Sequence, residues 1–173
     1  MSGDEGGAIV RRIRADEVEV YRAFRLRALA DSPDAFSDSY AAAMARPESF
    51  WQQRVADTAA GITSVLMVAV DEATGAWLGM TGCFIEHEGS GEALVVSVWV
   101  APEARRRRLG RRLCEAVEAW AKTRDVHTLK LWVVETNHRA RSLYEGAGFT
   151  PTDNNHPLPS NPSLNEIEMA RAI

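Results

Sequence analysis

A nearly unbroken apolar run, Ala93–Val100, constrains the fold more than any other stretch of the sequence. A half-exposed strand would alternate apolar with polar residues, so a continuous run rich in valine is typical of a strand covered on both faces. Pro102 ends this run, and an amphipathic helix follows from about Leu109 to Thr123. A buried strand that leads into a helix predicts an α/β domain in which helices cover both faces of a sheet.

A second strand and helix follow the first pair. Thr128–Val134 is again apolar, and Asn137–Ala147 is a helix that Gly146 and Gly148 end. Because strands joined through a helix run in the same direction, Ala93–Val100 and Thr128–Val134 are predicted to form a parallel pair.

The rest of the chain adds strands and helices to the same domain. Before the parallel pair we expect, in order, a strand at Ala8–Arg14, a helix from Ala15 to the stop at Ser32, a helix at Pro47–Ala60, and strands at Ser64–Asp71 and Trp77–His87. After it we expect a β segment beginning at Phe149, a Pro- and Asn-rich loop at Pro151–Ser163, and a closing strand at Ile167–Arg171. No repeat or linker interrupts this order, which predicts one domain over residues 8–173 after a disordered tail at 1–7.

The composition is that of a globular protein that buries a core. Hydrophobic residues make up 46% of the chain and charged residues 25%, whereas a disordered chain has fewer apolar residues. The net charge of −4 argues against a surface that binds nucleic acid or acidic lipid throughout. The chain has neither a run of eighteen apolar residues nor the residue order of a signal peptide at its start, so we expect a cytoplasmic protein without a membrane partner.

The two cysteines, Cys83 and Cys114, lie far apart and match no metal-ligand spacing. Each falls in an apolar segment, which predicts buried, reduced thiols rather than a disulfide or a catalytic thiol. No pair of histidines has the spacing of zinc ligands, and we therefore predict no metal site.

Positive charge gathers in the turn between the apolar strand and the long helix. Six of the 20 Lys and Arg residues lie between Arg105 and Arg112. The first turn of a helix has unpaired N–H groups and partial positive charge, so surrounding arginines favour a diphosphate there. Charge alone is explained equally well by a solvated basic face or a nucleic-acid patch. The position between a buried strand and a helix, with no second basic patch, favours the phosphate site.

Two motifs flank the second strand of the parallel pair. From Val100 to Arg111 the chain reads Val-x-Pro-x-x-Arg-Arg-Arg-x-Leu-Gly-Arg, and Asn137–Phe149 carries Asn, Ala, Leu-Tyr-Glu and Gly-Phe in that order. The first resembles the acetyl-CoA motif of the GNAT superfamily of N-acetyltransferases (Gln or Arg, two residues, Gly, one residue, Gly or Ala), and the second resembles that family's second signature. The resemblance covers most of the chain and has one departure, because Arg108 stands at a position that is usually Gly while Gly110 keeps the second small position.

The resemblance implies a single domain with a mixed, mostly antiparallel sheet, a splayed parallel strand pair and helices on both faces. It implies acetyl-CoA as co-substrate and direct transfer of its acetyl group to a primary amine, with the end of the apolar strand pairing with the pantetheine arm. The cofactor-binding residues that it implies are Val98, Trp99, Val100, Arg105, Arg106, Arg107, Arg108, Leu109, Gly110, Arg111, Asn137 and Tyr144.

The catalytic residues follow from the same resemblance. Tyr144 matches the tyrosine that protonates the leaving thiolate, and a phenol with a pKa of ~10 is reasonably matched to a thiol near 8.5. Family members often use a carboxylate of a central strand as the base, but Ser97 occupies the middle of this strand. We assign the base to Glu86, and the other candidates are His87 and Glu135, followed by His138 and His156.

The acceptor amine is not specified by the sequence. In the family its pocket is built by the first two helices and the late hairpin, which here are Leu29–Trp51 and Pro151–Leu164. A small amine, an antibiotic, a peptide N-terminus and a lysine are all open, as is a homodimer. Two further functions are open: a catalytically silent acyl-CoA-binding module, and a nucleic-acid-binding protein that uses the Arg105–Arg112 run.

Overall fold

Seven strands form one sheet in the computed structural model, which describes residues 7–173. The strands are β1 (Ala8–Arg12), β2 (Ser64–Asp71), β3 (Trp77–Phe84), β4 (Glu92–Val100), β5 (Thr128–Val134), β6 (Thr150–Leu158) and β7 (Asn161–Ala172). They are arranged in the order β1-β2-β3-β4-β5-β7-β6, and every neighbouring pair is antiparallel except β4 and β5. The predicted mixed sheet and its parallel pair are therefore confirmed.

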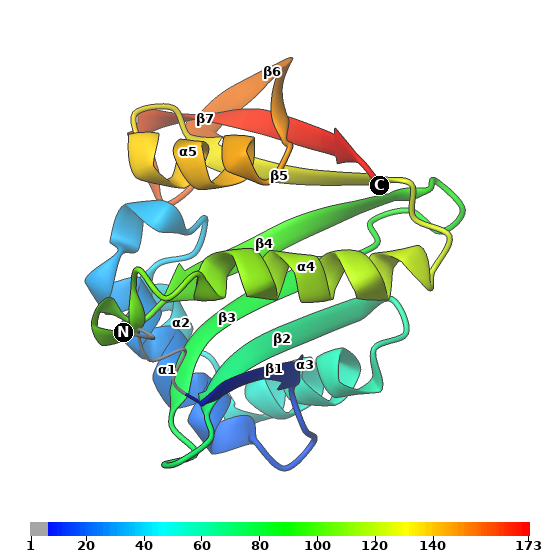
Figure 1. The fold of residues 1–173 in the computed structure, drawn as a ribbon. Coiled ribbons are helices and arrows are strands. Elements are labelled where there is room, and N and C mark those ends of the chain that lie inside the picture. The colour runs from blue at the N-terminus through cyan, green and yellow to red at the C-terminus, as the bar shows by residue number, and fades with distance from the viewer. Residues whose placement is uncertain (1–6) are drawn as a thin grey trace, which may run out of the picture.

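Helices cover both faces of this sheet (Figure 1). The helices are α1 (Val18–Asp31), α2 (Tyr40–Met44), α3 (Glu48–Ala60), α4 (Leu109–Lys122) and α5 (His138–Gly146), with 3-10 turns η1 (Pro33–Ala35) and η2 (Pro102–Ala104). Helices α1 and α3 bury Phe24 and Trp51 in a core on one face, whereas α4 and α5 bury Val117 and Tyr144 in a core on the other. The expectation of helices on both faces is confirmed.

Helix α4 approaches the sheet closely because β3 has a glycine beneath it. A Cβ atom at Gly79 would lie 3.0 Å from Leu113 Cδ1 and 3.2 Å from the Trp99 carbonyl oxygen. The predicted apolar stripe of the helix, which includes Leu113 and Val117, is buried against this surface. The close packing fixes the start of α4 beside the end of β4.

Strands β4 and β5 pair only over their first residues and then diverge. Glu92–Leu94 pairs with Thr128–Lys130, and no later residue of β4 pairs with β5. A bulge at Ser97, whose φ is +57°, shifts the register of β4 against β3. As a result Val95 packs on the α4 and α5 side, while Trp99 packs on the α1 side. Bulges bend a strand, and here the bend accompanies a gap between the two parallel strands.

The predicted loop at Pro151–Ser163 is wrong, because this segment forms β6 and the first part of β7. Proline cannot donate to a sheet and is tolerated in edge strands. Strand β6 is an edge strand of the sheet, and its register is irregular after Pro151 and after Pro157. The predicted closing strand at Ile167–Arg171 is the central part of β7.

The remaining expectations concern the ends of the chain and the thiols. The predicted tail at 1–7 lies, apart from Gly7, outside the described residues. Across residues 7–173, no helix is long and apolar enough to cross a membrane. Cys83 is buried and Cys114 is partly buried, and both are free thiols.

Candidate active site

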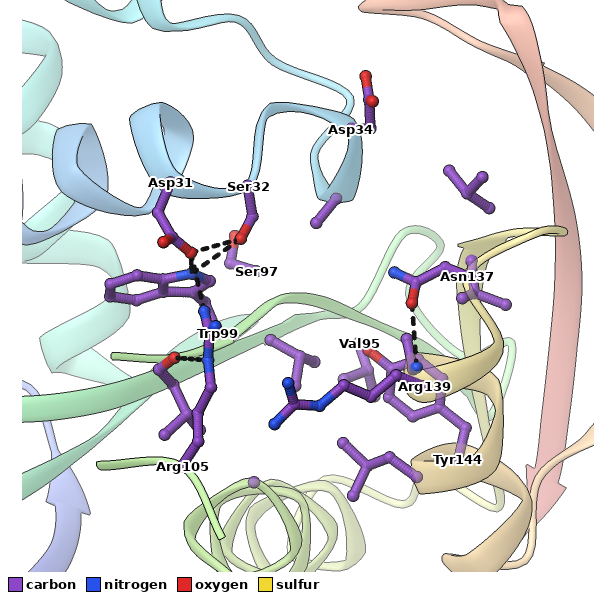
Figure 2. A pocket seen from close by; sticks show the side chains of 18 of the residues that line it. Asp31, Ser32, Asp34, Val95, Ser97, Trp99, Arg105, Asn137, Arg139 and Tyr144 are labelled. Carbon is purple, nitrogen blue, oxygen red and sulfur yellow. Dashed lines mark hydrogen bonds and ion pairs between the residues drawn. The ribbon is translucent and has the colours of Figure 1, made fainter. Parts of the chain in front are cut away.

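A cavity of about 1040 Å³ lies where β4 and β5 diverge, and Figure 2 shows part of its lining. Its walls come from β4, β5 and β7, from the turn before α4, from α5 and from η1. Val133 and Tyr144 line it and belong to the core under α4 and α5. Trp132 and Glu166 also line it, from the opposite face of the sheet because neighbouring strand residues alternate. The cavity therefore connects the two faces through the gap.

The start of α4 brings arginine side chains and the first N–H groups of a helix to this cavity. Arg106 and Arg108 have left-handed φ angles of +67° and +56°, and turns in which left-handed residues alternate with others are typical of anion-binding backbone. Leu109 and Gly110, in the first turn of the helix, have N–H groups with no partner inside the helix. A Cβ atom at Gly110 would lie 3.4 Å from Leu143 Cδ2, so the turn packs closely against α5.

The arginine-rich turn divides into side chains that line the cavity and side chains that hold the fold. Those that line it are Arg105, Arg106, Arg108 and Arg111, whereas Arg107 does not. Arg105 also ties the turn to α1, because its Nη2 donates to Asp31 Oδ2 at 2.8 Å and its Nε to the Val100 carbonyl at 3.1 Å. Arg112 donates to the Ala8 carbonyl at 2.8 Å and fastens β1. The single charge cluster of the sequence therefore has two roles.

The start of α5 adds two residues to the cavity wall. Asn137 caps the helix, since its Oδ1 accepts from the Ala140 N–H at 3.1 Å, and it also lines the cavity. Arg139 extends toward the middle of the cavity (Figure 2). The sequence did not single out Arg139, although its place in the first turn of a helix that opens with Asn137 was a usable signal.

Tyr144 lines the cavity from α5 and is 7% exposed. Its ring packs edge-on against Phe149, with 6.1 Å between the ring centroids. Burial raises the pKa of the Tyr144 hydroxyl, which has no hydrogen-bond partner among the described residues. The cavity therefore has a protonated, unengaged donor in its wall.

The end of β4 contributes backbone more than side chains. Val98, Trp99 and Val100 all line the cavity. The Trp99 indole points toward α1, however, where its Nε1 donates to Asp31 Oδ2 at 3.1 Å (Figure 2). Beyond Leu94 the edge of β4 that faces β5 has no strand partner, so an extended ligand could pair with it there.

The structure does not bring Glu86 to Tyr144. Glu86 is exposed in the turn after β3 and does not line the cavity, and its charge acts on Lys130 at the opposite end of β5. His87, Glu135 and the imidazole of His138 are also absent from the cavity wall.

Three carboxylates line the cavity, those of Asp31, Asp34 and Glu166, and the buried one is Glu166 of β7, which sequence reasoning missed. It is 4% exposed, and burial raises its pKa although the nearby His156 opposes this effect. The segment was predicted to become a strand only from Ile167. The alternation Glu166, Ile167, Glu168, Met169 was a signal for an earlier start, with the charged residues on one face. Within residues 7–173 no cluster of His, Cys, Asp and Glu could hold a metal ion.

Known proteins resemble this chain in sequence and in fold. Mycothiol acetyltransferase from Beutenbergia cavernae is 36% identical over 88 residues, which are 51% of this chain and 29% of that protein. The chain thus spans less than a third of the length of the curated relatives that it matches, at 29% and 21%.

Two solved structures share the fold over nearly the whole chain. The GNAT-family acetyltransferase from Streptococcus pneumoniae superposes with a TM-score of 0.80 at 16% identity, covering 96% of this chain and 99% of that one. The PaiA N-acetyltransferase from Thermoplasma acidophilum, solved in complex with coenzyme A, has a TM-score of 0.76 at 14% identity and the same coverage, 96% and 99%. A family model supplies the sequence evidence, because residues 25–149, more than half of the chain, match it. The chain belongs to the acetyltransferase (GNAT) family.

Proposed function

We propose that this chain is an N-acetyltransferase that transfers an acetyl group from acetyl-CoA directly to a primary amine. The observation that carries the proposal is the cavity between β4 and β5, which combines an anion site at α4, an unpaired strand edge and the buried Tyr144 hydroxyl. These features match the parts of the co-substrate: a diphosphate, an extended amide-containing arm and a thioester.

The residues of this cavity would bind the diphosphate, the pantetheine arm and the thioester of acetyl-CoA. The N–H groups at the start of α4, with Arg106 and Arg108 beside them, would hold the diphosphate. The unpaired edge of β4 past Leu94 would pair with the pantetheine arm as another strand would. When bound, acetyl-CoA supplies an activated acyl group as a thioester.

Two groups of the chain would assist the transfer. N–H groups near Val98, which lines the cavity, would donate to the thioester oxygen as negative charge develops on it. Tyr144 would donate to the sulfur as the carbon–sulfur bond breaks. Since burial raises the pKa of Tyr144, it keeps its proton, and its contribution is a hydrogen bond to the developing thiolate before any complete proton transfer.

The protonation of the two cysteines favours direct attack of the amine on the thioester over a covalent acyl-enzyme intermediate. Burial raises the pKa of Cys83 to about 12 and that of Cys114 to about 11, so both are protonated at neutral pH. Neither lines the cavity. Because a thiolate is the nucleophilic form of cysteine, these residues give no support to an acyl-cysteine route.

The proposal is tested by two measurements on the purified protein. Calorimetry is expected to show binding of acetyl-CoA, and a free-thiol assay is expected to show turnover with members of a panel of primary amines. The panel includes alkylamines, peptides and amines related to mycothiol, because the matched relatives are mycothiol acetyltransferases. Binding without turnover on any amine would favour the silent module, and salt-dependent DNA or RNA affinity without acetyl-CoA binding would favour the nucleic-acid alternative.

A further inference from the structure

Glu166 is a buried carboxylate that the protein leaves unsatisfied. It is 4% exposed in the cavity wall, and its Oε2 has no hydrogen-bond partner among the described residues. The nearest basic atom is His156 Nδ1 at 3.8 Å, and that nitrogen lies 2.8 Å from the Pro157 carbonyl oxygen. Burying a carboxylate costs free energy unless hydrogen-bond donors surround it. A ligand that donates to Glu166 would therefore be stabilised at this position.

Glu168, two residues further along β7 on the same face, provides the contrast. It is also buried, at 7% exposed, but its Oε1 accepts from Thr152 Oγ1 at 2.8 Å and from Asn154 Nδ2 at 3.0 Å. Glu168 does not line the cavity. The same strand therefore carries one carboxylate that the fold satisfies and one that it leaves open to the cavity.

The position of Glu166 separates it from the groups proposed to bind the co-substrate. Glu166 is the register partner of Val134 in β5, and Tyr144 packs with the neighbouring Val133, which points to the other face. Asp34 of η1 also lines the cavity and adds negative charge, and the third lining carboxylate, Asp31, is paired with Arg105. The arginines at the cavity wall come from the turn before α4, from α4 and from α5. The cavity thus has acidic residues on the side that the diphosphate would not occupy.

We propose that Glu166 binds the acceptor amine as its ammonium ion and accepts one proton from it, which makes the acceptor a cationic alkylamine. This inference rests on the proposed acetyl transfer. The ammonium group gives one proton to the Glu166 carboxylate, and the freed lone pair forms the carbon–nitrogen bond as the carbon–sulfur bond breaks. The second proton passes from the nitrogen to the departing thiolate, to which the Tyr144 hydroxyl donates a hydrogen bond. Glu166 then releases its proton to water, so the products are an amide, a thiol and one proton.

The surroundings of Glu166 act on the pKa of its carboxyl group in two opposite directions. Burial raises its pKa, and His156 of β6 lowers it. The other charged groups at this part of the molecule are Asp34 of η1 and Arg139 of α5, which line the cavity, and Glu168 on its own strand. General bases are most effective when their pKa approaches the working pH.

The first experiment compares Glu166→Gln with Glu168→Gln, a matched change of a buried carboxylate on the same strand. For alkylamines, Glu166→Gln is expected to lower kcat/KM by about 100-fold or more, with unchanged acetyl-CoA affinity. The loss is expected to be much smaller for an aromatic amine that is already uncharged, and the acidic limb of the pH profile should disappear. Glu168→Gln should retain the wild-type preference between amines. Equal losses for both amine types, or wild-type kcat/KM in Glu166→Gln, would overturn the inference.

A second readout needs no turnover. Calorimetry with butylammonium at neutral pH is expected to show binding to the wild type and to Glu168→Gln, and loss of that binding in Glu166→Gln. This outcome would support the ammonium site even if no amine were acetylated, a result that would remove only the proposed transferase function. Equal butylammonium binding by all three proteins, or none by the wild type, would overturn the assignment of Glu166.

Discussion

At the scale of single residues, the site is defined by groups that the fold leaves without partners. The Tyr144 hydroxyl and Glu166 Oε2 both lack hydrogen-bond partners among the described residues, although most buried polar groups in proteins have one. By contrast, Arg105 and Trp99 are engaged with Asp31. The sequence motifs predict a cofactor-binding role for both Tyr144 and Trp99. Their contacts differ, because the Tyr144 hydroxyl has no partner among the described residues whereas the Trp99 indole is hydrogen-bonded to Asp31.

Removing the Tyr144 hydroxyl tests its proposed role. Tyr144→Phe is expected to lower kcat by about 100-fold, because the leaving thiolate loses its donor, while acetyl-CoA affinity stays near that of the wild type. Free-thiol release and calorimetry on the same preparation measure both quantities. Phe keeps the edge-on packing against Phe149, so the variant should fold normally. Unchanged turnover would remove Tyr144 from the mechanism.

At the scale of elements, two residues with left-handed backbone lie at the cavity, Arg108 in the turn before α4 and Ser97 in the bulge of β4. Arg108 occupies the N-cap of α4 with φ +56° and ψ 17°, a conformation that glycine adopts without cost. This explains why glycine is usual at this position, and why arginine is tolerated: its N–H remains in place. Ser97 adopts φ +57° in the bulge of β4, where Arg25 Nη1 donates to its Oγ at 2.7 Å.

Replacing Arg108 by glycine should relieve local strain. Arg108→Gly is expected to raise the free energy of unfolding by about 0.5–1 kcal/mol, the left-handed penalty of ~1–2 kcal/mol less the entropy of an added glycine. Chemical denaturation measures the change. Arg111→Gly is the control, because Arg111 lies inside the first turn with helical backbone and should lower stability. Equal effects of the two variants would contradict the argument.

The role of the bulge at Ser97 can be tested by substituting residues that adopt a positive φ with more or with less strain. Ser97→Val is expected to destabilise the fold by about 1–3 kcal/mol, since a β-branched residue is strained in this region. It should also weaken acetyl-CoA binding if the bulge sets the path of β4. Ser97→Gly loses the contact with Arg25 but accepts the backbone, so it should bind acetyl-CoA better than Ser97→Val. The reverse order of affinities would show that the bulge does not shape the site.

At the scale of the whole molecule, an unsatisfied buried carboxylate links the site to global stability. The pKa of Glu166 is raised in the folded protein above the ordinary value of 4.5. At pH values between 4.5 and the raised pKa of the folded protein, Glu166 is protonated in the folded state and ionised in the unfolded state. The contribution of Glu166 to stability therefore falls as the pH rises through this range. Destabilised functional groups of this kind are common in active sites.

Glu166→Gln should therefore be more stable than the wild type at neutral pH, with a Tm difference that vanishes below about pH 4.5. Carboxylates such as Glu17, whose pKa the bond from Arg11 lowers, give the opposite slope. Because both proteins share those groups, the difference between their melting curves across pH isolates Glu166. A variant less stable than the wild type at neutral pH would contradict the prediction.

Local patterns determined much of this architecture. The valine-rich run, the proline after it and the helical stripe from Leu109 establish a buried strand followed by a helix, because each depends on neighbours within a few residues. The parallel pairing of β4 with β5 follows from that order, and so does the prediction of an anion site at the arginine-rich turn. The prolines of β6 misled the same reasoning, because an edge strand can accept them and sheet position is not a local property.

The tertiary structure alone decided which side chains share the cavity. Glu166 faces it because β7 pairs with β5 at Val134, and it lacks donors because β6 offers them to Glu168 instead. Both facts depend on the register between strands that are distant in sequence, and one residue of slip would turn Glu166 to the other face. The sequence by itself determined the strand–turn–helix unit and the arginines at its turn, whereas the strand register determined which buried carboxylate faces the cavity without a hydrogen-bond donor.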